Sequence, residues 1–258
     1  MVHNKYFWFN KVLSPKQCQD IINLGLSQIK KSKEDGIDVS GTTAGDNHKQ
    51  AADKKNAVAQ NDKDFEDLKS ENIDVNNSYV RDSEVTWLDD DWIYDIIMPY
   101  VNRANTSAGW NFDIDFGEKF QFTVYKPGGF YGWHSDSGMC NFSKYKRIIP
   151  GITEKDENGK YPPQYISSDQ NNRIGKVRKL SATINLTEPE QYKGGNLKFD
   201  FGPHSDGERY HECIEIRPQG SMVVFPSFVH HQVTPVDVGI RYSLVLWSLG
   251  KPFREDIL

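Results

Sequence analysis

The stretch YKPGGFYGWHSD, Tyr125–Asp136, places a histidine and an aspartate two residues apart. Its Pro-Gly-Gly reads as a turn, and the residues that follow, Gly132–Ser137, are predicted to form a strand. Side chains at positions i and i+2 of a strand point to the same face, so His134 and Asp136 should project together. An imidazole nitrogen and a carboxylate oxygen arranged in this way can both reach one metal ion at about 2.0–2.2 Å. The stretch therefore predicts two ligands of a metal site.

A histidine from a distant strand would complete this pair. Two histidines and one carboxylate occupy one face of an octahedron and leave the other positions open, which is typical of non-haem Fe(II) oxygenases. Taken alone, however, a His-x-Asp pair is more often a surface histidine beside a solvated aspartate. The rest of the chain has to decide between these interpretations.

The chain as a whole favours a mainly β core with flanking helices. Ser14, Pro15 and Gln17 form a capping box ahead of apolar residues at helical spacing, and a second helical pattern follows Asp91. From Lys119 onward the apolar period becomes two, and short strands with Gly and Pro turns predict a closed or sandwiched core. The predicted strands are Tyr79–Leu88, Phe120–Tyr125, Gly132–Ser137, Lys179–Leu186, Asn196–Phe201, Cys213–Arg217, Ser221–Phe225, Gln232–Val236 and Arg241–Leu249.

We expect one domain with two long polar segments outside its core. The expected boundaries are 1–258 for the domain, 1–118 for its N-terminal support, 31–77 for an insertion, 119–254 for the core and 138–178 for a long loop. The insertion is predicted to be mobile, because its composition cannot bury enough apolar surface to offset chain entropy. The long loop directly follows Asp136 in the chain, so it is either a lid over the site or an insertion without a role.

Composition excludes several classes of protein. Lys and Arg number 31 against 36 Asp and Glu, and this net charge of −5 argues against a dedicated DNA-binding surface. No apolar run approaches the length of a membrane span, and the N-terminus does not read as a signal peptide. Three widely spaced cysteines suggest no disulfide framework and fit a reducing compartment. We therefore expect a cytoplasmic protein that does not bind membranes, with nucleic acid an unfavoured partner.

Five segments together resemble the 2-oxoglutarate/Fe(II) oxygenases of the prolyl 4-hydroxylase type. Tyr125–Asp136 is similar to the motif that opens their metal site, and RKLSATINLTEPEQYKGGNL, Arg178–Leu197, to their central strand pair and Gly-Gly turn. GSMVVFP from Gly220, HQVTPV from His231 and GIRYSLVLW from Gly239 resemble the distal histidine and the oxoglutarate-binding arginine. The resemblance is closest to the prolyl/lysyl hydroxylase domain branch. It implies a double-stranded β-helix, or jelly roll, with helices on one side.

The resemblance also implies site residues. Iron would be held by His134, Asp136 and His231, the last chosen over His230 because it begins the family's His-x-Val-x-Pro pattern. Arg241 would bind the far carboxylate of 2-oxoglutarate, since a guanidinium makes two parallel charge-assisted hydrogen bonds. The other residues implied in co-substrate binding are Tyr125, Ser243 and Asn185, the last standing where many relatives carry a tyrosine. The aromatic residues implied at the substrate entrance or pocket wall are Tyr131, Trp133 and Trp247, each of which also fits ordinary packing.

The function implied is an Fe(II)- and 2-oxoglutarate-dependent dioxygenase. Such an enzyme uses O2, hydroxylates an unactivated C–H and releases succinate and CO2, with ascorbate as reductant. The substrate implied first is a prolyl residue of a peptide or protein, followed by a lysyl residue or a free amino acid. The alternatives are a nucleic-acid oxygenase, a non-catalytic metal-binding jelly roll and a zinc hydrolase. Trp247 stands where related demethylases carry a second arginine, and a hydrolase would leave Arg241 unexplained.

Overall fold

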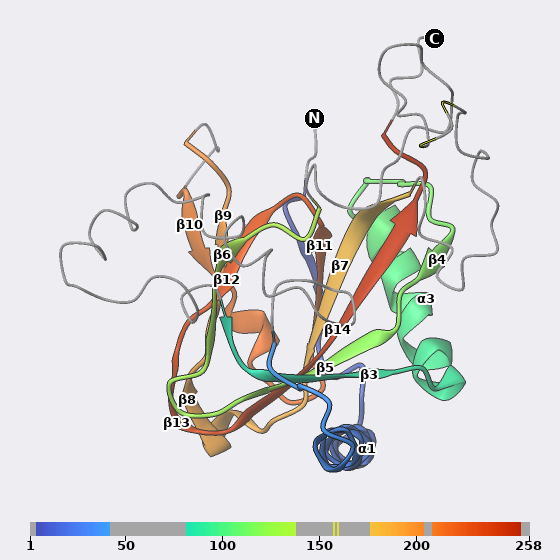
Figure 1. Ribbon diagram of the computed structural model, residues 1–258. Helices are drawn as coiled ribbons and strands as arrows, with labels where there is room; N and C mark the ends of the chain where they lie inside the picture. Colours follow the sequence, from blue (N-terminus) through green and yellow to red (C-terminus); the bar gives the residue numbers. More distant parts are fainter. Residues whose placement is uncertain are drawn as a thin grey trace, which may run out of the picture.

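The computed structural model describes residues 4–41, 81–137, 157, 159, 176–203 and 208–253. Two antiparallel sheets enclose an interior, and helices lie beside the larger one (Figure 1). The described helices are α1 (Pro15–Glu34) and α3 (Asp91–Ser107), with short 3-10 turns η2 (Pro189–Gln191) and η3 (Ile214–Ile216). None of the helices in these ranges is long and apolar enough to cross a membrane. The prediction of a mainly β fold with flanking helices is confirmed.

The larger sheet has seven strands, all antiparallel to their neighbours. Its order is β1 (Phe7–Phe9), β11 (Met222–Pro226), β7 (Val177–Asn185), β14 (Arg241–Gly250), β5 (Phe120–Tyr125) and β3 (Glu84–Leu88), with β4 (Phe116–Gly117) also paired to β14. The smaller sheet has the order β10 (Tyr210–Glu212), β9 (Leu197–Asp200), β12 (His230–Val233), β6 (Phe130–His134) and β2 (Arg81–Asp82). A third pair joins β13 (Val236–Gly239) to β8 (Tyr192–Gly194).

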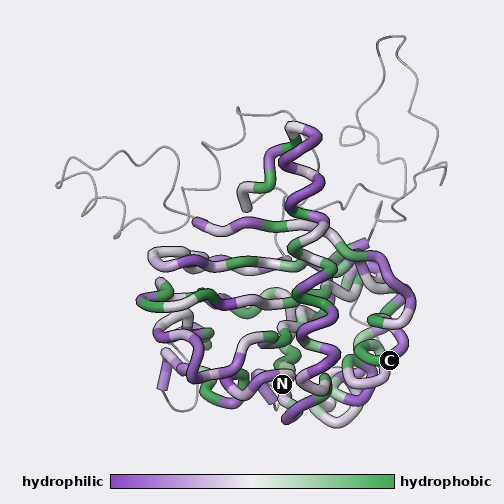
Figure 2. Tube along the Cα trace, turned by 90° about the horizontal axis from the view of Figure 1, so that it is seen from below, coloured by the Kyte–Doolittle hydropathy of each residue, from purple (hydrophilic) through white to green (hydrophobic). Residues whose placement is uncertain are grey.

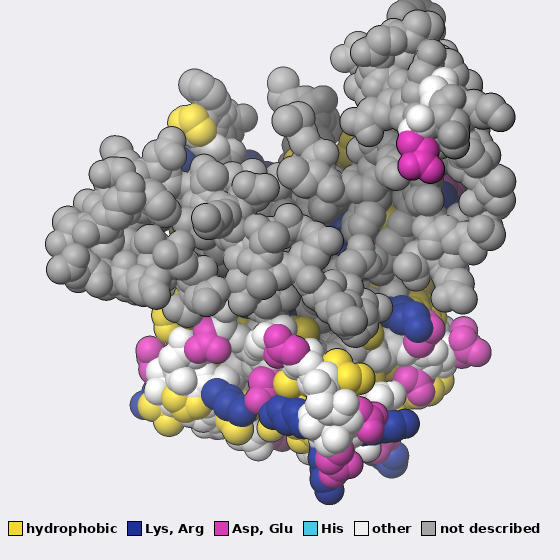
Figure 3. Space-filling view, in the orientation of Figure 1, with side chains coloured by type: hydrophobic (Ala, Val, Ile, Leu, Met, Phe, Trp, Pro, Cys, Tyr) yellow, Lys and Arg dark blue, Asp and Glu magenta, His cyan; other side chains and the backbone are white. Residues whose placement is uncertain are grey.

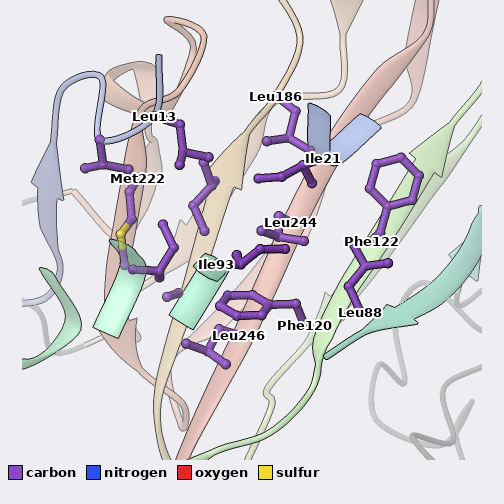
Figure 4. Close-up of a cluster of buried hydrophobic side chains, with 14 of the residues drawn as sticks. Leu13, Ile21, Leu88, Ile93, Phe120, Phe122, Leu186, Met222, Leu244 and Leu246 are labelled. Carbon is purple, nitrogen blue, oxygen red and sulfur yellow. The ribbon is translucent and has the colours of Figure 1, made fainter. Parts of the chain in front are cut away.

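The main hydrophobic core lies between the helices and one face of the larger sheet. It joins helix residues such as Ile21 and Ile93 to alternate strand residues such as Phe120, Leu244 and Leu246 (Figure 4). Because alternate strand residues face opposite sides, the other face of this sheet is left for the interior between the sheets. That interior face carries the polar residues discussed below.

Helix α1 begins and packs as its sequence predicts. Ser14 accepts a hydrogen bond from the Gln17 N–H at 3.2 Å, and Gln17 Oε1 accepts one from the Ser14 N–H at 2.8 Å. The helix lies across the strands, as the view from below shows (Figure 2). A β-carbon on Gly25 would overlap the ring of Phe122, so this glycine permits the close approach of helix and sheet.

The described surface around α1 and β3 carries charges of both signs (Figure 3). Lys33 and Lys126 both pair with Glu84, at 2.6 and 2.9 Å. These pairs fasten the end of α1 and the end of β5 to β3. Both ion pairs therefore help to hold β3 in place.

Two strand predictions are wrong in instructive ways. Residues 213–217 form the turn η3 instead of a strand, because the chain must cross there from β10 to β11 and Pro218 cannot donate to a sheet. The segment Gly132–Ser137 is shifted: β6 ends at His134, and Ser137 donates its N–H to the Ser227 carbonyl at 2.9 Å. Asp136 therefore lies in a bend beyond the strand.

Strand boundaries elsewhere differ less. The predicted strand Gln232–Val236 is divided into β12 and β13, and Pro235 lies at the break. The short strands β1, β4, β8 and β10 were not predicted, since two or three residues carry too little periodicity. The strand predicted at Tyr79–Leu88 is described from Arg81 and is divided into β2 and β3.

Residues 31–41, predicted to be the first part of a mobile insertion, are described and packed against the fold. Helix α1 continues to Glu34, Val39 is buried, and Ser40 forms a bridge with Glu84. Lysine and glutamate are good helix formers, so a polar composition did not end the helix. The rest of this segment, 42–77, lies outside the described residues, as does nearly all of the long loop for which a lid was the hypothesis.

Candidate metal centre

Three side chains that could hold a metal ion meet in the interior between the sheets. They are His134 at the end of β6, Asp136 just beyond it, and His231 on β12. Strands β6 and β12 are neighbours in the smaller sheet (Figure 1). One ligand atom of each lies within 4.8 Å of the other two, and among the described residues this is the one such group of three. The Nε2 atoms of His134 and His231 lie 3.6 and 3.5 Å from the nearest Asp136 oxygens.

Register places the two histidines together. His231 on β12 pairs with His134 on β6, and a register shift follows between His231 and Val233. His230 faces the other side of the same strand, where its register partner is Asp200 on β9. The choice of His231 over His230 therefore agrees with the geometry of the strand.

Backbone carbonyls orient both imidazoles. His134 Nδ1 lies 2.8 Å from the Gly132 carbonyl, and His231 Nδ1 lies 2.9 Å from the Val229 carbonyl. A carbonyl can only accept, so each Nδ1 carries the proton and each Nε2 presents its lone pair toward Asp136. Metal-ligating histidines are commonly held in this way.

Electrostatics favour the protonation states that a divalent metal needs. Burial alone would raise the pKa of Asp136, but His231, His134 and Arg178 together hold it well below its usual range. Burial and the neighbouring His134 lower the pKa of His231 to about 4. Near neutral pH the group therefore combines an ionised carboxylate with a neutral His231 imidazole, which fits a divalent iron.

Arg241 is a buried cation that has no anionic partner among the described residues. It is 2 % exposed, and its Nη1 has no hydrogen-bond partner. Its guanidinium carbon lies 5.5 Å from the ring centroid of Tyr125, and no carboxylate in the described ranges forms an ion pair with it. A buried charge left in this state is costly, so the site fits a ligand that brings its own carboxylate.

The residues around Arg241 leave room for the aliphatic part of its side chain. A β-carbon on Gly195 would lie 3.0 Å from Arg241 Cδ, and Gly195 has a φ of +59° that favours glycine. Ser243 is buried two residues along β14, on the face that Arg241 occupies. Tyr125 lies opposite Arg241 on β5. The structure thus brings Arg241, Tyr125 and Ser243 together.

Asn185 differs from the other residues implied in co-substrate binding, because its amide is bonded within the protein. Its Nδ2 donates to the carbonyls of Thr187 and Arg217, at 2.8 and 2.6 Å. Its Oδ1 accepts from the Thr187 N–H at 3.3 Å. Because both amide donors are used, Asn185 holds the end of β7 and the turn before β11, and it has no donor left for a ligand.

The three implied aromatic residues differ in position. The Tyr131 ring stacks on His134 with centroids 3.5 Å apart, and burial raises its pKa to about 12. Trp133 packs instead against the exposed Tyr210 of β10, with centroids 5.7 Å apart. The register shift between β6 and β12 falls between Tyr131 and His134 and interrupts the alternation of β6, so Tyr131 contacts His134 whereas Trp133 contacts Tyr210.

Trp247 lines the interior as implied, and it has a partner that sequence reasoning missed. The Arg178 guanidinium lies 3.9 Å from the Trp247 ring centroid and makes a two-point ion pair with Glu118, at 2.6 and 3.0 Å. Arg178 precedes and is out of phase with the polar alternation of β7, in which Lys179, Ser181, Thr183 and Asn185 alternate with apolar residues, because the register of β7 against β14 shifts at this point. That alternation was the available sign of a polar inner face.

Comparisons with known proteins agree with this site. Residues 120–249, just over half of the chain, match the family model described as the 2OG-Fe(II) oxygenase superfamily. A PKHD-type hydroxylase of Bordetella pertussis is 31% identical over 137 residues, which is 52% of this chain and 44% of that protein. A PKHD-type hydroxylase of a Synechococcus strain is 38% identical over 82 residues, 31% of this chain and 34% of the relative. The chain thus matches less than half the length of these relatives.

Solved structures show the same fold. A Pseudomonas putida prolyl-4-hydroxylase has a TM-score of 0.51 at 16% identity, covering 96% of this chain and 94% of that one. A viral collagen prolyl hydroxylase of Paramecium Bursaria Chlorella virus-1, in a 2OG complex, has a TM-score of 0.52 at 17% identity, covering 96% and 97%. A Trichoplax adhaerens prolyl hydroxylase, with a hypoxia inducible factor peptide fragment, has a TM-score of 0.50 at 17% identity, covering 95% and 83%.

Proposed function

The chain belongs to the 2OG-Fe(II) oxygenase superfamily, and from that membership we propose that it is a 2-oxoglutarate-dependent dioxygenase that hydroxylates a prolyl residue of a peptide or protein. The observation that carries the proposal is the buried Arg241, with an unpaired Nη1, in an interior that also holds a His-Asp-His group. A metal site alone would suit several chemistries. A buried guanidinium with an unpaired Nη1 adds a second feature, because it suits the binding of a carboxylate from an anionic co-substrate.

Each group has a distinct task in this proposal. His134, Asp136 and His231 would hold Fe(II) through Nε2, a carboxylate oxygen and Nε2. When bound, the iron would supply O2 activation coupled to decarboxylation of 2-oxoglutarate to succinate and CO2. Arg241 would bind the far carboxylate of the co-substrate with paired hydrogen bonds, which orients it.

The aromatic side chains that line the interior would exclude water from the proposed site. Tyr125 and Trp247 are buried, and Tyr131 stacks on His134. Flat aromatic side chains and excluded water suit a reaction at an unactivated C–H, because water would compete with the substrate. Tyr131 and Trp247 are therefore the residues we propose to contact the substrate.

The prolyl substrate is supported by the names of similar proteins. Relatives are PKHD-type hydroxylases, and structures of the same fold are prolyl hydroxylases, one with a bound peptide fragment. Ascorbate is proposed as the reductant on the same ground. Cys18 and Cys213 are buried free thiols, which supports our proposal of a cytoplasmic location, where thiols stay reduced.

The test is succinate formation with Fe(II), 2-oxoglutarate, O2 and ascorbate, with and without a panel of proline-containing peptides. We expect one or more peptides to increase succinate formation and to gain about 16 Da (one oxygen atom) on proline. His134→Ala should abolish both, and His230→Ala is the matched control because its side chain faces away. Succinate formation that no peptide increases, together with oxidation of another substrate class, would contradict the prolyl assignment.

A further inference from the structure

Two buried serines form a hydrogen-bonded chain that ends on Asp136. Ser181 Oγ lies 2.6 Å from Asp136 Oδ2, and Ser227 Oγ lies 2.9 Å from Ser181 Oγ. Both serines are 0 % exposed. They come from different strands of the larger sheet, since Ser181 is on β7 and Ser227 directly follows β11. Neither serine was singled out as a site residue from the sequence.

The direction of the chain follows from the chemistry of its end. An ionised carboxylate can only accept, so the Ser181 hydroxyl must donate its proton to Asp136. The Ser181 oxygen then accepts from the Ser227 hydroxyl. Consecutive hydrogen bonds of this kind polarise one another, and a bond to a charged acceptor is stronger than a neutral one. Asp136 Oδ2 is therefore held by a directed chain of two hydroxyls.

The backbone of the turn that carries Ser227 also supports His231, on the other side of the proposed metal site. Ser227 accepts from the Ser137 N–H at 2.9 Å and donates its own N–H to the Lys179 carbonyl at 3.0 Å. Two residues on, the Val229 carbonyl orients His231 at 2.9 Å. The turn between β11 and β12 thus fixes the segment that carries Asp136 and the ring of His231 together.

We propose that Ser181 and Ser227 are positioning residues that hold the Asp136 carboxylate in the orientation in which it faces both histidines. Asp136 Oδ1 lies 3.6 Å from His134 Nε2 and Oδ2 lies 3.5 Å from His231 Nε2, so Ser181 bonds to the oxygen on the His231 side. A carboxylate held in this way would bind a metal ion without first reorienting. This inference rests on the proposed metal site and assigns that site its supporting residues.

The experiment measures metal affinity, using Co(II) as a spectroscopic probe added to the metal-free protein. Ser181→Ala should weaken Co(II) binding about 10- to 100-fold, the usual range for a residue that supports a metal ligand. Ser227→Ala should weaken it less, because the Ser181 hydroxyl remains. Ser181→Thr restores a hydroxyl and should bind within a few-fold of the parent. Ser221→Ala is the matched control, since Ser221 is equally buried but bonds to Asn10 and to the Lys11 N–H.

The outcomes separate this inference from the proposed function. If the parent protein binds no Co(II), or if His134→Ala binds as well as the parent, the metal site itself is wrong. If the parent binds and Ser181→Ala binds equally tightly with an unchanged visible spectrum, the positioning role alone is wrong. Should Ser181→Ala fail to melt cooperatively, Ser227→Ala decides: weaker binding supports the role, and unchanged binding overturns it.

Discussion

Replacing Arg241 by methionine should stabilise the apoprotein and remove its response to 2-oxoglutarate. Arg241 is 2 % exposed with an unpaired Nη1, and no anionic partner for its charge lies among the described residues. Exchanging buried ionic groups for apolar side chains of similar volume is commonly neutral or stabilising, by about 1–4 kcal/mol. Loss of the cation–π contact with Tyr125 offsets about 1 kcal/mol of that. The free energy of unfolding should therefore change by between about zero and +3 kcal/mol.

Arg178→Met is the matched control, because Arg178 is also buried but has a carboxylate partner. Its guanidinium contacts Glu118 at 2.6 and 3.0 Å. Removing one member of a buried pair costs about 3–5 kcal/mol, since the other charge is left behind. Two buried arginines should therefore change stability in opposite directions when each becomes methionine. For a chain of this size, each kcal/mol moves the Tm by about 2–4 °C.

The ligand response completes the test. At 2-oxoglutarate concentrations of 100 times its Kd, the metal-loaded parent should gain about 2.7 kcal/mol from binding. Arg241→Met should gain almost nothing, and Arg241→Lys should need about 10- to 150-fold more ligand, because losing one charge-assisted bond is worth about 1.5–3 kcal/mol. Thermal melts with and without ligand under anaerobic conditions measure all of this. A large loss of apoprotein stability in Arg241→Met, with an intact ligand response, would refute the reasoning.

Further outcomes can be checked separately. His231→Ala should lose Fe(II) binding in equilibrium dialysis while His230→Ala retains most of it; the reverse result would mean that the strand register is wrong. Gly195→Ala should raise the oxoglutarate Kd and cost about 1–2 kcal/mol of stability, since its β-carbon would crowd Arg241 at a positive φ; an unchanged Kd by titration calorimetry would count against it. Because the folded pKa of His231, about 4, lies below its ordinary value, its contribution to stability is present above pH 6.5 and is lost as pH falls toward 4. Urea melts of the apoprotein should show that loss, and His231→Gln should flatten it.

Structural features that depend on local residue patterns were predictable from the sequence. The capping box fixed the start of α1, and period-two alternation placed β5 within its observed bounds. His134 and Asp136 were paired correctly in space, although the same-strand reasoning does not hold for Asp136, which lies in the bend after β6. Their closeness instead depends on the Ser137 hydrogen bond to Ser227, a contact between residues 90 positions apart.

Contacts made only in the folded chain were not predictable. Asn185 sits on the inner face as expected, but its amide is used by backbone carbonyls near the end of β7. Trp133 packs on Tyr210 while Tyr131 stacks on His134, because a register shift between β6 and β12 interrupts the alternation of β6. The ion pair of Arg178 with Glu118 joins residues 60 positions apart, so no local sequence pattern indicates it. The sequence shows which faces are polar, whereas pairing across faces needs the fold.

The most direct test of the central account is calorimetric titration of 2-oxoglutarate into the anaerobic protein. In our proposal His134, Asp136 and His231 on one side and Arg241 on the other form a single site for iron and the co-substrate dianion. We therefore expect one oxoglutarate per chain when Fe(II) is present, much weaker binding after chelation, and weaker binding in Arg241→Lys. Oxoglutarate binding of the same strength with and without metal, or no binding in the Fe(II)-loaded parent, would contradict it.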